Sequence, residues 1–454
     1  MSPSKKPKKA KPAKPNKAKR AKPKQAKAKL TKAKPAKAKK SPVTQAGPKR
    51  APVEKAEVKK DARPVTATPS YDVIIIGAGS VGLPIAYFLT KRKTNVLVID
   101  QHPASGQGQN KAAIGGVRAT HSDPAKILLC KESLKIFRAL EDEEGCDVGF
   151  KEGGYCFPVY TESIEKTLKG ILPIQKSFGL EIDWVGPEAI KEVIPGIREE
   201  GLRGGTVSPK DAQVSPLQAA VVFERLSAMR GATFKFNEKI TGIEIKNGTF
   251  KAVKTSEGRY RADKLVIAAG AEAREVGQLM GIDIPVTPDS HEAGITAPVA
   301  PCLDPLVVDL RPGPEGKTAN FYFGQNKEGQ IIFCYTPSEL FVGTNRESLS
   351  EFMPIVARRL IDLIPRFRNL LVRRVWRGLY PMTPDGVPVI DKHEEIDGLY
   401  LAVGMCGQGF MLGPGVGLNM ASLVLDGNML IAPEVAEPLK FNRDFYAARK
   451  EALK

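Results

Sequence analysis

The sequence predicts a mixed α/β protein behind a long disordered tail. Three features support this prediction: a Lys/Ala/Pro-rich segment over residues 1–70, a glycine-rich motif at 77–82 between an apolar run and a helix-like run, and alternating apolar and polar residues over 320–345. The glycine-rich motif is typical of a buried parallel sheet covered by helices, and the alternation is typical of an antiparallel sheet. A chain of 454 residues has room for about two to four domains.

The tail holds the excess positive charge of the chain. Residues 1–70 contain 24 basic and 3 acidic side chains, 11 prolines and no aromatic residue, so they cannot bury enough apolar surface to offset the entropy of ordering. The tail either binds a polyanion, such as nucleic acid or anionic lipid, or is a solvated extension without a partner. The other 384 residues hold 45 basic and 47 acidic side chains, and this near-neutral body gives no reason to expect nucleic-acid binding.

The distribution of Cys, His and apolar residues bears on the compartment. Six Cys without a Cys-x-x-Cys pair and four scattered His predict reduced thiols and no metal site. No apolar segment of the kind found in secretory signals follows Met1, and the tail is rich in Lys and Pro, unlike a mitochondrial transit peptide. The uncharged stretches 73–90 and 401–425 are broken by Gly and Pro, so they do not read as membrane spans. We expect a cytoplasmic protein, either free or peripheral at the inner face of the membrane.

The strongest motif is a nucleotide fingerprint. An apolar run at 71–76 predicts a strand, which leads into G-x-G-x-x-G at 77–82, a helix over 83–91 and a second strand over 95–99 that ends at Asp100. The glycines would permit a tight turn, the approach of a pyrophosphate and the packing of helix on strand, while the helix N-terminus attracts phosphate and the acid binds ribose hydroxyls. An acid at this position argues against a 2′-phosphate and so against NADP. The expected cofactor contacts here are Gly77, Gly79, Ser80, Val81, Gly82, Asp100 and Gln101.

Two later segments favour FAD over NAD, which the fingerprint alone does not separate. A strand-like run at 264–267 leads into small residues at 268–270, and another at 398–403 leads into a glycine-rich loop at 404–417. Each loop could press its backbone against a flat cofactor, and a helix that starts near Gly415 would direct its positive end at the flavin. Further expected cofactor contacts are Gly116, Ile240, Ala269, Gly270, Gly404, Gly407, Gly409, Gly413, Gly415, Val416 and Gly417.

A further helix is predicted after Ser215. The serine suits an N-cap, and Pro216 suits the first helical position. The apolar residues that follow fall at i, i+3, i+4 and i+7 and so form one buried face. These residues are Ala219, Val222, Phe223 and Leu226.

From about residue 71 to its end, the chain resembles the FAD-dependent amine and amino-acid oxidoreductases of the D-amino-acid oxidase superfamily. The nearest branch contains sarcosine oxidase β-subunits, proline dehydrogenase β-subunits and D-amino-acid dehydrogenases. The motifs that carry the resemblance are the fingerprint, Gly115-Gly116-Val117-Arg118, Asp211-Ala212-Gln213-Val214-Ser215-Pro216, Ala268-Ala269-Gly270, and Met382-Thr383-Pro384-Asp385-Gly386 before the glycine-rich loop.

The resemblance implies a Rossmann-like FAD-binding domain interleaved with an antiparallel-sheet substrate domain. After the tail at 1–70, the FAD-binding domain would collect 71–150, 205–285 and 376–454, and the substrate domain would collect 151–204 and 286–375. FAD is expected to bind non-covalently, because Gly378 takes the place of the cysteine that attaches the flavin in some relatives.

The resemblance also implies roles for individual side chains. Arg118 would bind a substrate carboxylate with its planar guanidinium, or else hold loop carbonyls or the flavin in place. Tyr380 would border the substrate or pack in the core, and His291 would be either a general base or a hydrogen-bonded structural residue. Gln408 and Met411 replace a His and a Lys of monomeric sarcosine oxidases, which argues against that activity as such.

The expected reaction is oxidation of the C–N bond of a small amino acid or secondary amine by hydride transfer to flavin N5, which gives an imine that hydrolyses. The electron acceptor would be oxygen, a quinone or a partner flavoprotein, and a second subunit would fit the resemblance. We favour a dehydrogenase, because the branch's oxygen-activating Lys has no match. Two alternatives remain: a 2-hydroxy-acid or glycerol-phosphate-type dehydrogenase of the same fold, and a non-catalytic flavoprotein whose basic tail binds polyanions.

Overall fold

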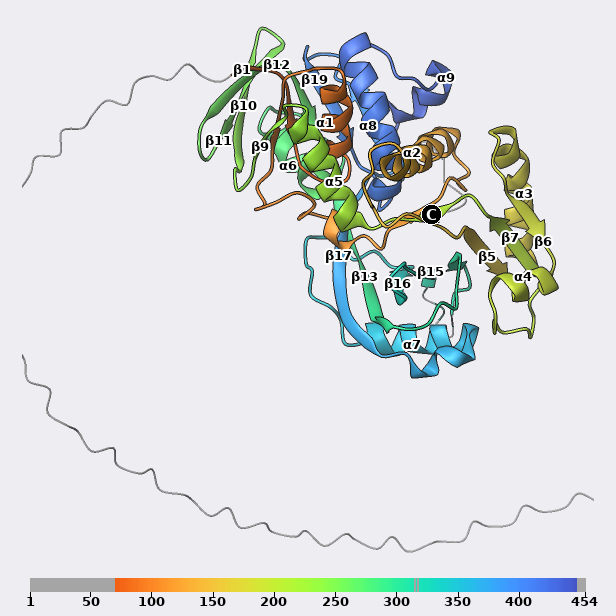
Figure 1. The fold of residues 1–454 in the computed structure, drawn as a ribbon. Coiled ribbons are helices and arrows are strands. Elements are labelled where there is room, and N and C mark those ends of the chain that lie inside the picture. Colours follow the sequence, from red (N-terminus) through yellow and green to blue (C-terminus); the bar gives the residue numbers. More distant parts are fainter. Residues whose placement is uncertain (1–69, 314–315, 317, 447–454) are drawn as a thin grey trace, which may run out of the picture. The chain divides into compact units, whose positions relative to one another are not determined.

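The computed structural model describes residues 70–313, 316 and 318–446. The predicted disordered tail at 1–70 therefore lies outside the described residues, apart from Ser70. The described residues form two eight-stranded sheets and one small three-stranded sheet, with helices packed against them. Figure 1 shows the first sheet with α1, α5 and α8 in the upper part of the view, and β13, β17 and α7 of the second sheet below it.

The first sheet has a parallel centre. Its parallel strands lie in the order β19-β12-β1-β2-β9, a β10–β11 hairpin extends β12 on one side, and β18 runs antiparallel to β19. Apolar side chains alternate between its two faces, which are both covered, as a parallel sheet requires. The strands are β1 (Ser70–Ile76), β2 (Val96–Ile99), β9 (Thr233–Lys235), β10 (Ile240–Lys246), β11 (Thr249–Thr255), β12 (Arg259–Ile267), β18 (Val389–Lys392) and β19 (Leu399–Val403).

Four helices pack on one face of this sheet. Their apolar residues share a single buried cluster with Val73, Ile75 and Val98 of the strands. The opposite face is covered by the hairpin and by the short helix α6 (Ala273–Gln278). The four helices are α1 (Gly82–Lys91), α2 (Pro124–Asp142), α5 (Pro216–Met229) and α8 (Gly409–Asp426).

The predicted helix after Ser215 is confirmed as α5. The Ser215 side chain accepts a hydrogen bond from Gln218 N, and Pro216 is the first helical residue. All four residues of the predicted apolar face are buried: Ala219, Val222, Phe223 and Leu226.

The predicted start of the last helix near Gly415 is wrong, because α8 already begins at Gly409. Pro414 lies inside the helix and cannot donate a backbone hydrogen bond. The Ser133 hydroxyl of α2 accepts a hydrogen bond from Gly415 N at 2.9 Å and lies 3.3 Å from the Leu412 carbonyl oxygen. This side chain satisfies backbone groups next to the proline, so the helix continues through it.

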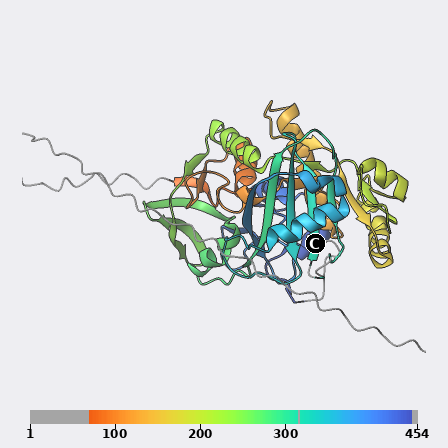
Figure 2. The ribbon, with the colours of Figure 1, turned by 90° about the horizontal axis from the view of Figure 1, so that it is seen from below.

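The second sheet is mostly antiparallel, in the order β17-β13-β16-β15-β14-β5-β7-β6. Helix α7 (Phe352–Leu363) covers one of its faces through a cluster that contains Phe321, Phe323, Phe333 and Val356. Figure 2 shows α7 lying across this sheet. The strands are β5 (Tyr155–Val159), β6 (Asp183–Val185), β7 (Gly204–Ser208), β13 (Thr287–Pro298), β14 (Leu306–Asp309), β15 (Thr318–Gln325), β16 (Gln330–Pro337) and β17 (Val372–Met382).

Small elements complete the fold. The third sheet joins β3 (Gly116–Val117), β8 (Ala212–Gln213) and β4 (Lys151–Glu152). The remaining helices are α3 (Glu162–Ser177), α4 (Pro187–Val193), α9 (Pro433–Ala436) and the 3-10 turns η1 (Asn110–Ala112), η2 (Gly270–Glu272), η3 (Pro365–Asn369) and η4 (Glu437–Leu439). No helix in the described part of the chain combines the length and apolarity needed to cross a membrane.

The strands do not follow the expected segment boundaries everywhere. β7 belongs to the second sheet although it lies almost wholly within 205–285, and β17 crosses the boundary at 376 because it pairs with β13 as far as Met382. The alternating stretch 320–345 forms the strands β15 and β16, but the second of them already ends at Pro337. The assignment of the two sheets to an FAD-binding and a substrate domain stays a prediction.

Candidate functional site

A cavity of about 580 Å³ is lined by both large sheets. On the first sheet, Gly77, Asp100, Ala268 and Gly404 each follow the last residue of a parallel strand, and all four line the cavity. Ligands of open parallel sheets bind at this edge, outside the carboxyl ends of the strands. The position of the cavity therefore follows from the topology of the first sheet.

The three fingerprint glycines have different environments. Gly77 has φ +109°, and a Cβ there would collide with the Ala268 carbonyl oxygen. A Cβ on Gly82 would collide with the Gly77 carbonyl oxygen, so this glycine lets α1 pack against the turn. A Cβ on Gly79 would have nothing within 4 Å, and this residue lines the cavity. Gly79 thus leaves a hollow beside the N-terminus of α1 into which a pyrophosphate fits.

Asp100 is held in place by hydrogen bonds. Its Oδ2 accepts from Ala78 N at 2.7 Å, and its Oδ1 accepts from His102 N at 2.8 Å and lies 2.9 Å from His102 Nδ1. The carboxylate is thereby fixed at the cavity wall, where a ribose diol could reach it. His102 lines the cavity as well, and it was not predicted from the sequence.

Most of the residues predicted to contact the cofactor line the cavity, together with the three predicted catalytic residues Arg118, His291 and Tyr380. The lining includes Gly77, Gly79, Ser80, Val81, Asp100, Gln101, Gly116, Ile240, Ala269, Gly270, Gly404, Gly407 and Gly409. The contacts themselves stay predictions.

Five predicted cofactor residues do not line it: Gly82, Gly413, Gly415, Val416 and Gly417. A Cβ on Gly413 would collide with the Ser80 carbonyl oxygen, and one on Gly415 would collide with the Leu129 carbonyl oxygen. These glycines lie inside α8 and allow it to approach α1 and α2 closely. The prediction of a loop from Gly413 to Gly417 is thus wrong, because these residues lie inside α8 and their glycines serve helix packing. Their contact with the cofactor stays a prediction.

The second sheet presents alternate side chains to the cavity, as the two-residue period of a strand requires. Phe321, Phe323 and Phe333 point towards α7, whereas their neighbours Tyr322 and Cys334 line the cavity. The cavity-facing set comes from four neighbouring strands: Asp289, His291 and Ala293 of β13, Asn320 and Tyr322 of β15, Cys334 and Thr336 of β16, and Gly378 and Tyr380 of β17.

Asp289 and His291 form a buried pair in this wall. His291 Nε2 lies 3.0 Å from Asp289 Oδ2, and His291 Nδ1 lies 3.3 Å from Thr336 Oγ1. Asp289 Oδ1 also accepts from Ser290 N and from Phe341 N at 2.7 Å. Burial raises the pKa of Asp289, but these hydrogen bonds and the imidazole outweigh it, so the pKa lies below its usual range. The carboxylate fixes the imidazole and the loop that carries Phe341.

Two tyrosine hydroxyls meet beside this pair. Tyr322 Oη and Tyr380 Oη are 2.9 Å apart, Cys334 Sγ is 3.9 Å from Tyr380 Oη, and the rings of His291 and Tyr380 are centred 3.9 Å apart. Burial raises the pKa of both tyrosines well above the usual range and raises the pKa of the Cys334 thiol to about 11. All three groups therefore stay neutral near pH 7 and act as hydrogen-bond donors or acceptors without charge.

Arg118 has a local partner. Its side chain is 7 % exposed, and Nη1 donates to the Thr120 carbonyl oxygen at 2.5 Å. This contact corresponds to the structural alternative considered for Arg118, and its role towards a substrate carboxylate stays a prediction. The guanidinium charge also acts on Asp211, whose pKa is raised to about 6 by burial although Ala119 N, Ser208 and Arg118 oppose the rise.

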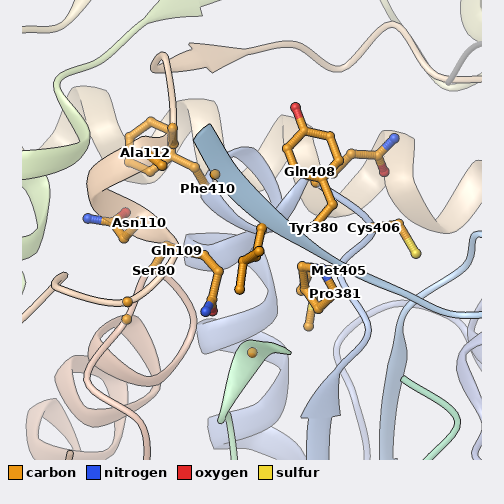
Figure 3. A pocket seen from close by; sticks show the side chains of 18 of the residues that line it. Ser80, Gln109, Asn110, Ala112, Tyr380, Pro381, Met405, Cys406, Gln408 and Phe410 are labelled. Atoms are coloured by element: carbon orange, nitrogen blue, oxygen red, sulfur yellow. The ribbon is translucent and has the colours of Figure 1, made fainter. Parts of the chain in front are cut away.

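The N-terminus of α8 borders the cavity beside the fingerprint loop, since a Cβ on Gly409 would lie 3.6 Å from Ser80 Oγ. Figure 3 shows Ser80, Gln109 and Asn110 on one side of the view, and Tyr380, Pro381, Cys406 and Gln408 on the other. Gln408 is the N-cap of α8, and its Oε1 is buried without a hydrogen-bond partner in the described structure. A ligand that offers N–H or O–H groups would satisfy this atom.

The cavity fits FAD. The hollow at Gly79, the fixed carboxylate of Asp100 and the free acceptor on Gln408 suit a pyrophosphate, a ribose and a group with hydrogen-bond donors. Gly378 offers no nucleophile, and a Cβ there would lie 2.7 Å from the Ala112 Cβ. Non-covalent attachment stays a prediction, as all six cysteines are free thiols and two of them, Cys334 and Cys406, line the cavity.

Sequence reasoning missed most of the second-sheet wall. Asp289, Tyr322, Cys334 and Thr336 were not predicted as site residues. These residues lie on separate strands, and a signal existed only in the alternation over 320–337, which identifies one face of a strand but not the face that meets the cofactor.

Comparisons with known proteins agree with this site. Residues 72–423 match the model of a family described as FAD dependent oxidoreductase (DAO). A crystal structure of L-proline dehydrogenase from P. horikoshii is 30% identical, with a TM-score of 0.77 over 82% of this chain and 98% of that one. Glycine oxidase from Geobacillus kaustophilus is 25% identical, with a TM-score of 0.74 over 83% of this chain and 100% of that one.

A curated relative of similar size is the sarcosine oxidase subunit beta of Rhodobacter capsulatus, which is 24% identical over 372 residues, covering 80% of this chain and 87% of the relative. The predicted resemblance and the predicted cofactor are thereby confirmed, because the family match spans the whole of the cavity-forming body. The chain belongs to the DAO family of FAD-dependent oxidoreductases, and it is an enzyme that uses FAD.

Proposed function

We propose that the enzyme oxidises the C–N bond of a small amino acid that carries a free carboxylate and a primary or secondary amine. The observation that carries this proposal is the cluster of His291, Tyr322 and Tyr380 on the second sheet, which faces the same cavity as the fingerprint loop. FAD, when bound, accepts two electrons and a hydrogen from the carbon next to the amine. The protein must hold the carboxylate and take one proton from the amine. The other groups that face the substrate must stay uncharged.

The tyrosine pair supplies a donor for the carboxylate. Two neutral hydroxyls 2.9 Å apart hold two protons, and only one is needed for the bond between them. The second proton is free to be donated to a substrate carboxylate oxygen. The buried guanidinium of Arg118 adds a positive charge to the same cavity and favours an anionic group there.

The imidazole supplies a base for the ammonium form of the substrate. With Nε2–H donated to Asp289, His291 Nδ1 is the acceptor, and it faces the Thr336 hydroxyl at the cavity surface. A proton that leaves the substrate ammonium would move to Nδ1, and the neutral amine would then lose its α-hydrogen with two electrons. The resulting imine is hydrolysed by water to an oxo acid and an amine or ammonia.

The names of the relatives agree with this substrate class. L-proline dehydrogenase, glycine oxidase and sarcosine oxidase are named for small amino acids whose nitrogen is primary or secondary. Identities of 24% to 30% do not select one of these substrates.

The first test is an anaerobic titration of the FAD-loaded protein. Glycine, sarcosine, L- and D-proline, other D- and L-amino acids and 2-hydroxy acids are added while the visible flavin absorbance is recorded. Bleaching by at least one amine supports the proposal and identifies the substrate. Bleaching by hydroxy acids but by no amine would overturn it in favour of C–O oxidation.

The role of the imidazole is tested by His291→Gln. We expect kcat/KM to fall by about 100-fold and the dependence of activity on pH to change, because the side chain that accepts the substrate proton is removed. His393→Asn is the matched control: His393 Nδ1 accepts from backbone N–H groups at 3.2 Å, as an Asn oxygen can, and it does not line the cavity. An unchanged pH profile in His291→Gln would argue for the structural role instead.

We also propose that the enzyme is a dehydrogenase. Lys239 is the one lysine among the described residues that line the cavity, and it follows Glu238, whose N–H donates to the Asp100 carbonyl oxygen at the ribose end. Within the described residues, the second-sheet wall thus offers no lysine ammonium that could activate oxygen. Stopped-flow reoxidation of the reduced protein should be slower with oxygen than with a quinone, and faster reoxidation by oxygen would contradict the proposal.

A second subunit is a further proposal. The relative from Rhodobacter capsulatus is named as a subunit, and helix α5 carries Leu217, Val221 and Met229 at 55%, 60% and 76% exposure. Native mass spectrometry of the protein purified from its own cells would show a heteromeric mass if the proposal holds and a multiple of one chain if it does not.

A further inference from the structure

One tyrosine of the second sheet faces the cavity with an unused hydroxyl. Tyr155 of β5 lines the cavity and is 3% exposed, and its Oη has no hydrogen-bond partner within the described residues. Burial raises the pKa of this hydroxyl well above its usual range, so it is a proton donor at neutral pH. A phenylalanine would fill the same space without burying an unpaired polar group. A ligand with an acceptor oxygen would satisfy the hydroxyl.

A guanidinium lies next to this hydroxyl. A Cβ on Gly116 would collide with Tyr155 Oη, and two residues further along both segments the Arg118 guanidinium carbon is 5.9 Å from the centre of the Phe157 ring. Residues two apart on a strand share a face, so the hydroxyl and the guanidinium are neighbours. Within the described residues Arg118 makes one hydrogen bond, to the Thr120 carbonyl oxygen, and so keeps further N–H donors for an anion.

This donor set is separate from the tyrosine pair. Cys334 Sγ of β16 lies 3.9 Å from Tyr380 Oη, so the hydroxyls of the tyrosine pair meet over β16. The Cβ on Gly116 that would collide with Tyr155 Oη would also lie 2.9 Å from Leu306 Cδ1 of β14. β14 and β16 lie on either side of β15, two strand spacings or about 10 Å apart. A single carboxylate is too short to reach both donor sets.

We propose that Tyr155 and Arg118 form a second anion-binding point, and that the substrate is a small amino acid with a second carboxylate. The proposal rests on the proposed function, in which the tyrosine pair holds the first carboxylate. With a hydrogen bond of about 2.8 Å at each end, a span of about 10 Å leaves about 4 to 5 Å between the two acceptor oxygens. The two carboxylates of aspartate or glutamate can reach this separation.

The test is a binding titration of the FAD-loaded protein with acids that carry no amine or hydroxyl to oxidise. Glutarate and valerate have chains of the same length, and glutarate carries the second carboxylate. The change in the visible flavin absorbance reports the binding of either acid. The dissociation constant of glutarate should be at least about tenfold lower than that of valerate, because charge-assisted hydrogen bonds form at the second point. Equal constants would overturn the proposal.

Two variants locate the effect. Tyr155→Phe removes the hydroxyl and keeps the ring, so the dissociation constant of glutarate should rise about tenfold while those of valerate and FAD stay unchanged. Tyr400→Phe is the matched control, because Tyr400 is 4% exposed, its hydroxyl has no hydrogen-bond partner within the described residues, and it does not line the cavity. It should leave all three constants unchanged.

The outcomes are distinct. A loss confined to glutarate in Tyr155→Phe establishes the second point. An equal loss for glutarate and valerate shows that the hydroxyl only shapes the cavity, and weaker binding of FAD assigns it to the cofactor; either result overturns the proposal.

Failure of the proposed function would be seen separately. Binding of glutarate does not involve oxidation of an amine, so the second point can hold while the C–N assignment fails. If amines do bleach the flavin, glutamate or aspartate should do so at lower concentration than the corresponding amide. Bleaching by glutamine and asparagine at equally low concentrations would leave C–N oxidation in place and contradict the second carboxylate.

Discussion

The two sides of the cavity are built in different ways. The first sheet presents backbone: the turn at 77–82, the loop at 268–270 and the chain from Gly404 to Gly409. The second sheet presents side chains of neighbouring strands, such as His291, Tyr322 and Tyr380. We propose that the backbone side holds the cofactor, which the whole family shares, and that the side-chain wall, which can change one residue at a time, sets the substrate.

The largest effect should come from filling the hollow on the backbone side. In Gly79→Val the new side chain would occupy the space beside the N-terminus of α1, where a Cβ meets nothing within 4 Å. FAD affinity should fall by more than about 10³-fold, because several phosphate contacts are lost together. Equilibrium dialysis of the FAD-free protein measures this loss.

Its control separates binding from folding. The thermal midpoint of the FAD-free Gly79→Val protein should match that of the unchanged FAD-free protein, since the Cβ meets no atom of the protein. Gly413→Val should instead lower the midpoint, because its Cβ collides with the Ser80 carbonyl oxygen. Equal FAD affinity in Gly79→Val and the original protein would contradict the placement of the pyrophosphate.

On the side-chain wall, Asp289→Asn should lower kcat/KM by about 10³-fold with little change in FAD affinity. The Asn oxygen can still accept from Phe341 N, but its amide now donates to His291 Nε2, which forces the proton onto Nδ1 and removes the acceptor that the substrate needs. Steady-state kinetics measures kcat/KM, and titration with FAD measures the affinity for the cofactor. A loss of FAD affinity comparable to the loss of kcat/KM would show that the side-chain wall also contributes to FAD binding.

The third sheet reaches the cavity only through Gly116, and Asp211, which directly precedes its strand β8, should control stability. Burial raises the pKa of Asp211 to about 6, above the value near 3.8 of an exposed carboxyl, so the folded state holds the proton more tightly. The stabilisation is fully present below pH ~4 and is lost as the pH rises to ~6, a change of about 3 kcal/mol. The free energy of unfolding of Asp211→Asn, measured with urea at several pH values, should no longer show this dependence on pH. If it changes with pH as steeply as in the original protein, the assignment to Asp211 is wrong.

The smallest effect should follow Tyr322→Phe. Loss of one neutral donor should raise KM for the amino acid about tenfold and leave kcat and FAD affinity nearly unchanged, because Tyr380 keeps its hydroxyl. Steady-state kinetics with the substrate found by titration provides the measurement. A fall in kcat that exceeds the rise in KM would assign the hydroxyl pair to the chemical step instead.

The difference between the two sides explains what the sequence could predict. Gly77, Gly79 and Asp100 lie within 24 residues, and their spacing is dictated by one strand–turn–helix–strand unit, so their meeting at one cavity could be predicted, while their contacts with the cofactor stay predictions. The pairs Asp289–His291 and Tyr322–Tyr380 depend on the order and register of β17, β13, β16 and β15, which no local pattern contains. His291 and Tyr380 were anticipated only through family resemblance, and their partners were not.

Near the C-terminal end, the glycine pattern did not show where the loop ends and the helix begins. Gly404, Gly407 and Gly409 line the cavity as predicted, but Gly413 and Gly417 belong to the interior of α8. A proline at 414 suggested a loop, and the Ser133 hydroxyl that lets the helix pass through it comes from a distant segment. Helix boundaries at such sites depend on tertiary contacts and cannot be read from propensity.

The pairing of β13 with β17 forms a long ribbon that leads from the first sheet to α7. Ten residue pairs join the two strands from Thr287–Met382 to Thr296–Val372. Val286 before β13 packs in the core of the first sheet, and the chain after β17 continues to β18 of that sheet, so this ribbon is anchored at one end and reaches α7 at the other (Figure 1). The connection between β16 and α7 borders the cavity through Ser338 and Leu340. Loops accept insertions more readily than paired strands do, so we expect the length of this connection to be where the size of admitted molecules evolves.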